Sequence, residues 1–289
     1  MKKIKYLLLF VFLMVFMCGC GSKEGEKLIE QVLESEEGDG FTLDEFPFYN
    51  QKESKKLVKF YNKIIKGKYD DYCFVEKDSR GRLKATMNED GMFYVGEMKN
   101  NRPHGKGVLF DGYGQYDMVV LGNFKKGRLD GYVIQFSEYE GVLSVSGEGE
   151  CDKNRLNGTG VEYNSVSWEF IEGLSEETRE EKTEVLEIYG VEIAHKKIVA
   201  AGGVRYLGDY KDGERHGKGK EYSYENRLLY EGEFKDDEYH GKGTLYYEDG
   251  ETVQYKGKFK KGDFHGKGKL YDENGKKIYK GKFKNGDYK

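Results

Sequence analysis

The chain has 289 residues, and 48 Lys and Arg residues nearly balance 52 Asp and Glu residues, which leaves a net charge of −4. Because a mildly acidic chain with mixed charges has no broad electrostatic attraction to nucleic acid, we expect no nucleic-acid partner. The chain also holds 24 Tyr and 17 Phe residues against one Trp residue. This is a heavy load of tyrosine for so polar a chain, and it points to packing or binding roles for the rings.

The N-terminus has the order of features found in a bacterial secretion signal. Three lysines precede an unbroken apolar run from Leu7 to Met17, which is too short to span a bilayer comfortably and has the length of a signal-peptide core. Gly19 is the small residue that a signal peptidase requires, and Cys20 follows it. This segment resembles the bacterial lipobox, in which the cysteine after the cut carries diacylglycerol on its sulfur. Met17 and Cys18 depart from the usual pattern of a leucine and a small residue.

The resemblance implies that residues 1–19 are removed as a signal peptide and that Cys20 is the lipid attachment site. The lipid would anchor the chain to the cell membrane, on its extracytoplasmic face. A plain signal peptide and an N-terminal membrane anchor are the alternatives. Cys73 and Cys151 then remain as an even pair in a compartment where disulfides persist. A disulfide between them and two separate thiols both fit this count.

The C-terminal third contains a repeat of about 24 residues, a period that indicates a repeat architecture. Units that open with Tyr, any residue and Gly start at Tyr206, Tyr230, Tyr255 and Tyr279, at spacings of 24, 25 and 24 residues. Each complete unit also holds a His-Gly-Lys-Gly block, and one more good copy lies upstream. The motif residues of the four complete copies are Tyr94, Gly96, His104, Gly105, Gly107, Tyr206, Gly208, His216, Gly217, Gly219, Tyr230, Gly232, His240, Gly241, Gly243, Tyr255, Gly257, His265, Gly266 and Gly268.

Two worn copies lie between these, one at Leu121–Tyr132 and one at Val145–Gly160, with Gly147 as the first motif glycine of the second. The pattern Tyr-x-Gly-x-Phe, followed about ten residues later by His-Gly-x-Gly, resembles the MORN repeat (membrane occupation and recognition nexus). The resemblance covers residues 92–172, where the first copy is good and the next two are degenerate, and residues 206–289, which end in a half-repeat. It implies a mainly β fold, an elongated single-layer antiparallel sheet of tandem β-hairpins.

The residues of one unit predict a hairpin by themselves. Tyr255, Gly257 and Phe259 share one face of an alternating run, and the lysines between them share the other, the pattern of a half-exposed strand. The glycines leave space that cross-strand aromatic rings can cover. Two-residue hairpin turns are expected at Asn274-Gly275 and Asp249-Gly250.

Two segments outside the repeats have other patterns. After a lipidated spacer at residues 20–52, residues 53–91 predict a small α+β cap. An apolar stripe that begins at Leu57 predicts its helix, with Ser54 as the N-cap. Residues 173–205 form a polar, β-rich insertion, for which an irregular hairpin is the expected structure. An insertion in an array often lies on the binding face.

Catalysis is not indicated by any motif. Four histidines occupy the same repeat position, and we interpret them as packed or hydrogen-bonded hairpin side chains. Ligands of one metal ion would have to converge on a point, whereas these lie one repeat apart. The Gly-Lys-Gly segments lie within strands, whereas a phosphate-binding loop lies between a strand and a helix. We therefore expect neither an enzyme nor a bound metal or cofactor.

MORN arrays are associated with scaffolding, self-association and contact with phospholipid headgroups, so the resemblance implies binding rather than turnover. The first hypothesis is a non-enzymatic, membrane-anchored surface lipoprotein whose repeats form a scaffold for a protein or cell-envelope partner. The alternative is a glycan- or cell-wall-binding module that uses exposed rings such as Tyr239, Tyr246 and Tyr247. A hydrolase in residues 41–90 is a weaker alternative, because that segment has no histidine and few convergent polar groups.

The half-repeat from Tyr279 to Lys289 should end the array with an edge strand. Its outward side carries Lys280, Lys282 and Lys284. Charged edges discourage further pairing, so the segment is expected to be a cap. The same edge could pair with its twin on a second molecule, which predicts a weak homodimer, with a monomer as the alternative.

Overall fold

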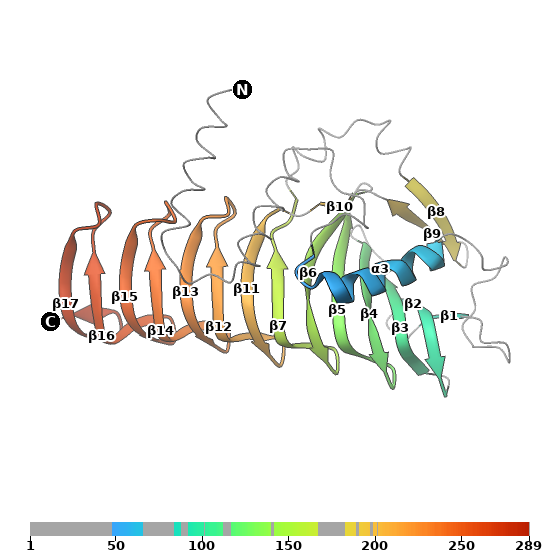
Figure 1. Cartoon of the computed structure of the whole chain (residues 1–289), viewed down its shortest axis with the longest axis horizontal. Helices are drawn as coiled ribbons and strands as arrows, with labels where there is room; N and C mark the ends of the chain where they lie inside the picture. Colours follow the sequence, from blue (N-terminus) through green and yellow to red (C-terminus); the bar gives the residue numbers. More distant parts are fainter. Residues whose placement is uncertain are drawn as a thin grey trace, which may run out of the picture.

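The computed structural model describes residues 48–65, 84–87, 92–100, 102–111, 117–139, 142–166, 183–188, 191–196, 199–200 and 202–288. These residues contain a 16-stranded sheet, a two-stranded sheet and one helix. Along the large sheet the strands follow one another in chain order, and the array is long and one layer thick (Figure 1). This confirms the mainly β fold of tandem hairpins. In the described part of the chain, no helix has the length and apolarity needed to cross a membrane.

The strands of the large sheet are, in spatial order, β1 (Lys84–Met87), β2 (Met92–Lys99), β3 (Arg102–Asp111), β4 (Asp117–Lys125), β5 (Arg128–Tyr139), β6 (Val142–Asp152), β7 (Arg155–Tyr163), β11 (Val204–Lys211), β12 (Glu214–Tyr222), β13 (Leu228–Lys235), β14 (Glu238–Tyr246), β15 (Val253–Lys260), β16 (Asp263–Tyr271), β17 (Lys277–Lys284) and β18 (Asp287–Tyr288). Outside this path, β10 (Val199–Ala200) pairs in parallel with β6, and β8 (Thr183–Ile188) and β9 (Val191–Lys196) form a separate antiparallel hairpin. The helix is α3 (Gln51–Ile65).

One face of the sheet is filled by the motif tyrosines and phenylalanines, and we call it the ring face. The Tyr255 ring is fully buried and covers Gly257 and Gly268, which face each other across β15 and β16. A Cβ atom on Gly268 would lie 2.5 Å from Cζ of Tyr255, so the ring leaves no room for one. The same ring packs edge-on against Phe283 of the next unit, with centroids 5.0 Å apart. Tyr94, Tyr206 and Tyr230 cover their own glycine pairs in the same way.

A tight turn closes each repeat and also joins it to its neighbour. At Lys261-Gly262 both residues have positive φ, 52° and 80°, as a two-residue turn matched to the twist of a hairpin requires. The Gly262 N–H donates to the carbonyl of Tyr239 in the preceding repeat, at 3.0 Å. Successive hairpin tips are thus tied together by backbone hydrogen bonds.

The connections between repeats are longer, and the prediction of two-residue turns at Asn274-Gly275 and Asp249-Gly250 is wrong. In the first connection the Asp272 N–H donates to the Lys276 carbonyl at 2.9 Å. Gly275 has a φ of 74°, whereas Asn274 does not adopt a positive φ. Both favoured two-residue turns need a positive φ at their first position, which here is Asn274. The chain instead forms a three-residue loop with glycine at its last position.

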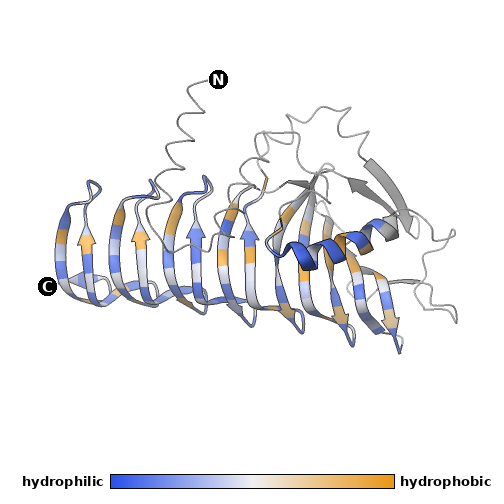
Figure 2. Ribbon diagram, viewed as in Figure 1, coloured by the Kyte–Doolittle hydropathy of each residue, from blue (hydrophilic) through white to orange (hydrophobic). Residues whose placement is uncertain are grey.

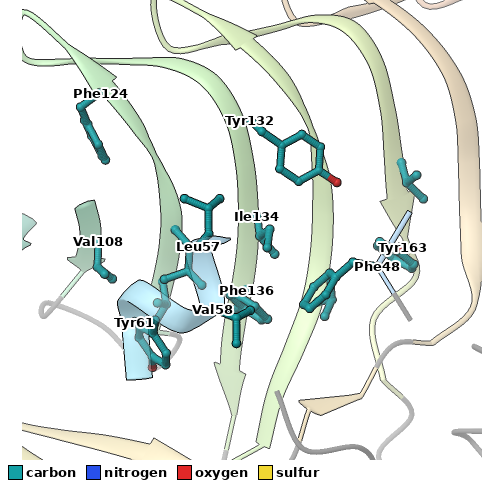
Figure 3. Packing of buried hydrophobic residues seen from close by; sticks show 14 of the residues in the cluster. Phe48, Leu57, Val58, Tyr61, Val108, Phe124, Tyr132, Ile134, Phe136 and Tyr163 are labelled. Atoms are coloured by element: carbon teal, nitrogen blue, oxygen red, sulfur yellow. The ribbon is translucent and has the colours of Figure 1, made fainter. Parts of the chain in front are cut away.

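Helix α3 lies on the face of the sheet opposite to the ring face and contacts β3, β4 and β5 (Figure 1). Leu57, Val58 and Tyr61 are buried, as their helical spacing predicts. Figure 3 shows these side chains beside Ile134 and Phe136 of the sheet. The helix therefore covers the first repeats and contributes to their core.

The helix begins before the predicted N-cap. Asn50 caps it, because its Oδ1 accepts a hydrogen bond from the Glu53 N–H at 3.2 Å. Ser54 lies one turn inside the helix, where it is fully buried and its Oγ donates to the Asn50 carbonyl at 2.7 Å. The prediction of Ser54 as N-cap is therefore wrong.

The third unit has a different register from the one predicted. Gly149 faces Gly160, as Gly257 faces Gly268 in an intact unit. The first motif glycine is therefore Gly149 and not Gly147. The position between the motif tyrosine and glycine, held by Lys256 in an intact unit, is then occupied by Glu148.

The insertion leaves the sheet unbroken, because β7 pairs directly with β11. A buried arginine reinforces this junction on the ring face. Arg215 Nη2 lies 2.8 Å from Glu162 Oε2 on β7, and Nη1 lies 2.9 Å from Glu221 Oε1. The guanidinium carbon lies 4.8 Å from the centre of the Tyr206 ring. These contacts hold the two repeat blocks together across the junction.

The C-terminal half-repeat contains a further short strand. After a turn at Asn285-Gly286, β18 pairs with Phe283 and Lys284 of β17. Tyr288 stacks on Tyr279 with centroids 4.5 Å apart. The end of β17 is thus covered by its own chain, whereas residues 277–282 face no strand on that side within the described residues. The homodimer predicted for this edge stays a prediction.

The glycines beneath the rings should be intolerant of any larger side chain. We expect Gly243→Val to destabilise the protein by roughly 1–3 kcal/mol, because the new side chain would overlap the fully buried Tyr230 ring. Denaturant unfolding of the purified chain measures this loss. Thr244→Val, on the opposite face of the same strand, is the matched control and should change the free energy of unfolding far less. Equal losses for the two variants would contradict the packing described for the ring face.

Candidate functional site

The repeated histidines do not form a site in the structure. His104, His216, His240 and His265 are each partly exposed and lie in four different hairpins. His216 Nδ1 lies 3.6 Å from Asp236 Oδ1, and the carbonyl of His240 accepts a hydrogen bond from the Tyr230 hydroxyl at 3.4 Å. Within the described residues, no three His, Cys, Asp or Glu residues are placed to hold one metal ion.

The cysteines selected from the sequence fall mostly outside the described residues. Cys20 and Cys73 both lie outside them, so the lipid attachment and the disulfide stay predictions. Cys151 is buried on the ring face and has a free thiol within the described part of the chain. Its burial, together with nearby Asp152 and Asp130, raises the pKa of the thiol to about 11. This thiol is therefore protonated at neutral pH.

The rings expected to be exposed are partly buried. Tyr239 stacks on Tyr230 with centroids 3.8 Å apart, and its hydroxyl donates to Glu221. Tyr247 donates its hydroxyl to the Tyr271 carbonyl at 2.8 Å, and Tyr246 is also partly buried. The large hydrophobic side chains that are exposed in the described residues are Tyr224, Ile278 and Tyr288. The expected row of exposed rings is therefore not present at Tyr239, Tyr246 and Tyr247.

The opposite face carries a row of side chains that crosses the whole array, and we call it the central row. Its members occupy the position just before the first motif glycine and the position just after the second one, and each faces the next across adjacent strands. From β2 to β17 they are Val95, Val108, Leu121, Ile134, Glu148, Val161, Leu207, Lys220, Glu231, Thr244, Lys256, Lys269 and Lys280.

The character of the central row changes along the array. The six members from Val95 to Val161 are buried, those from Leu207 to Thr244 are partly exposed, and Lys256, Lys269 and Lys280 are exposed. Figure 2 shows hydrophobic residues concentrated in the strands around α3 and hydrophilic ones predominating towards β17. The same backbone position thus provides a helix-binding surface at one end and a charged surface at the other.

Glu148 is the one charged residue in the buried part of the central row, and it binds the segment that leads into α3. Its Oε1 accepts hydrogen bonds from the Tyr49 N–H at 2.7 Å and from the Tyr163 hydroxyl at 2.6 Å. Its Oε2 accepts one from the Tyr132 hydroxyl. Burial raises the pKa of the Glu148 carboxyl above its usual 4.5, although these three donors act in the opposite direction.

Glu148 is not among the residues predicted from the sequence to be functional. The sequence nevertheless contains a signal for a special role of this residue. Glu148 lies between Gly147 and Gly149, at a position that is apolar in the two preceding units. Val95 and Leu121 hold the equivalent places there. A carboxylate in the otherwise apolar part of the row indicates a specific partner, since a buried charge without one is strongly unfavourable.

Loss of the Glu148 carboxyl should loosen the attachment of α3. We expect Glu148→Ala to destabilise the protein by roughly 1–3 kcal/mol, because it leaves the Tyr132 and Tyr163 hydroxyls and the Tyr49 N–H without their acceptor. Hydrogen exchange of the helix amides, with denaturant unfolding, measures the effect. Glu150→Ala, exposed on the same strand, is the matched control and should be close to neutral.

The same carboxyl gives a pH dependence whose direction is set by its raised pKa. The Glu148 carboxyl makes its full contribution to stability when the pH is below its pKa in the unfolded chain. This contribution is lost as the pH rises through the higher pKa that the carboxyl has in the folded chain. The stability advantage of the wild type over Glu148→Gln, which does not titrate, should therefore shrink as pH rises above 4.5. An advantage that grows with pH would show that the ionised form is the stabilising one.

Comparison with known protein families identifies the repeats independently. The family model of the MORN repeat matches residues 94–112, 206–225, 230–252 and 255–277. A comparison with curated proteins finds none that matches the chain. Each matched segment contains the tyrosine that lies over a pair of facing glycines. These four segments of the chain are MORN repeats.

Proposed function

We propose that this protein is a non-enzymatic scaffold that binds a protein or cell-envelope partner on the face of the central row. One observation carries the proposal: the buried half of this face already holds a helix, α3, through Leu57, Val58 and Tyr61. The other half, from Leu207 to Lys280, has no helix over it within the described residues. A surface that binds one segment of its own chain is well suited to bind a segment of another.

The proposal includes an anchor on the extracytoplasmic face of the cell membrane, through lipid on Cys20. The order of basic flank, apolar run, Gly19 and cysteine supports it. An acyl anchor would also hold the molecules on a surface, where the effective concentration of a membrane partner is raised.

The glycan-binding alternative has less support than the scaffold. It depends on a series of exposed rings, and most motif rings pack against one another on the ring face. Tyr224 and Tyr288 are the exposed tyrosines among the described large hydrophobic residues. They lie at opposite ends of the second repeat block, in the β12–β13 loop and in β18. The hydrolase alternative falls on residues 41–90, most of which lie outside the described part of the chain.

A bulky side chain in the middle of the uncovered half should block the scaffold. We expect Thr244→Trp to reduce capture of the specific partner from solubilised envelopes roughly tenfold, the effect of losing about 1.4 kcal/mol of binding free energy. Thr252→Trp, in the β14–β15 loop, carries the same ring away from the central row and should capture as the wild type does. Capture that is equal for both variants would refute the proposed face. Glycan-array binding that is lost with Tyr224→Ala would favour the glycan module instead.

The lipid anchor should depend on one sulfur atom. Replacing Cys20 with Ala should leave uncleaved precursor or release the protein from the membrane fraction, because the acyl group has no other attachment point in the lipobox pattern. Cell fractionation and intact-mass analysis of the mature protein measure this. Cys18→Ala is the matched control and should still be lipidated. A mature N-terminus elsewhere without added acyl mass would rule the anchor out.

A further inference from the structure

The exposed end of the central row lies in a group of seven lysines, which we call the lysine field. They come from four neighbouring strands, share one face and are all exposed: Lys242, Lys256, Lys258, Lys267, Lys269, Lys280 and Lys282. Lys256 faces Lys269, and Lys269 faces Lys280. None of the seven forms an ion pair with another described residue.

The lysine field is not a requirement of the repeat. At the same motif positions on β12 and β13, Lys218 faces Glu233 and Lys220 faces Glu231, so opposite charges face each other across the strands. In the lysine field, like charges face each other directly, an arrangement that destabilises a sheet. The repeat can therefore place carboxylates here, and in this part of the array it does not.

Protection of the sheet edge accounts for only part of the lysine field. Lysines on an edge strand discourage pairing with other molecules, which explains those of β17. The lysines of β14, β15 and β16 lie on interior strands, whose backbone groups are already paired on both sides. Lys242 and Lys258, which face each other on two of these strands, have no edge to protect. The positive charge of these interior lysines is instead explained by an anionic partner.

The lysine field also surrounds a shallow hollow. The lining consists of five lysines and two glycines: Lys256, Lys267, Gly268, Lys269, Lys280, Gly281 and Lys282. Neighbouring strands lie roughly 4.8 Å apart, so the facing lysines repeat at about that interval across the array. Charges this close act together, because the Debye length is about 8 Å at physiological ionic strength.

The composition of the hollow distinguishes between anionic partners. Membrane-surface sites combine basic residues with apolar side chains that enter the lipid, and the lining has none. Proteins that bind single-stranded nucleic acid add aromatic rings on which bases stack, and the lining has no ring either. A partner that presents only a line of anionic groups fits both the spacing and the absence of apolar contacts.

We propose that the lysine field binds a linear phosphate polymer, which lies across β14–β17 with its phosphates between the facing lysines. This deepens the proposed function by naming the chemistry of one cell-envelope partner, and it depends on the same face of the sheet. The lysines act as hydrogen-bond donors and as charges, so binding should weaken steeply as salt concentration rises.

The test measures binding of fluorescent inorganic polyphosphate to the full mature chain by anisotropy. We expect the double variant Lys256→Glu/Lys269→Glu to lose affinity roughly tenfold or more, since it removes two phosphate contacts and adds repulsion. Lys218→Glu/Lys220→Glu makes the same change in net charge on β12 and should change affinity far less. The first variant should unfold close to the temperature of the wild type, because its two new carboxylates face each other as the two lysines did, while the carboxylate at position 269 also faces Lys280.

Four results would overturn the proposal. They are equal affinity for the two double variants, binding that does not change with salt, saturation by inorganic phosphate at the same concentration as by polymer, and tighter binding to oligodeoxythymidine or to phosphatidylglycerol vesicles than to polyphosphate. If polyphosphate fails to bind while a protein partner is still captured in a Thr244-dependent way, the polymer is ruled out and the scaffold stands.

Discussion

Every intact repeat depends on one contact, a tyrosine ring that lies over two glycines facing each other across adjacent strands. Since a Cβ atom on either glycine would overlap the ring, the identity of the glycines, the position of the ring and the register of the strands are set together. Tyr255 also packs edge-on against Phe283 of the next unit, so the contact that closes one hairpin joins it to its neighbour. A lone hairpin is marginally stable, and this coupling makes a chain of hairpins into a stable sheet.

Because the ring face is committed to this packing, the opposite face is free to change from one repeat to the next. The central row uses that freedom. It is apolar where α3 lies, contains one buried carboxylate at Glu148 where the chain enters the helix, and becomes basic from Lys256 to Lys280. The chemistry of this face can therefore change along the array without any change in the fold. The central row is the place where this protein differs from a uniform repeat.

The period and the alternation of one unit predicted the fold, since ring, glycine and lysine positions each repeat at a fixed spacing. The apolar stripe from Leu57 also predicted the helix, but the N-cap was assigned to Ser54 because capping by Asn50 depends on where the chain meets the sheet. The worn third unit offers two candidate glycines, Gly147 and Gly149, and only the pairing with Gly160 distinguishes them. The central row was missed for the same reason: its members lie far apart in sequence and meet only through strand register.

The worn second unit shows how the two faces of the sheet compensate for each other. In the second unit Val120 occupies the tyrosine position, and Val133 occupies the place of the second motif glycine, where the absent ring leaves room for it. On the opposite face of that unit, Leu121 and Ile134 are almost completely buried beside α3. Burial of apolar surface on the helix side thus replaces what the missing ring would contribute. The units from β11 to β16 have no helix over the opposite face within the described residues, and each of them keeps its tyrosine and both glycines. In the described residues, the degenerate second unit lies beneath a second layer, whereas each C-terminal unit without such a layer keeps the intact motif. The intact motif therefore allows the C-terminal units to be stable while the lysine field stays uncovered.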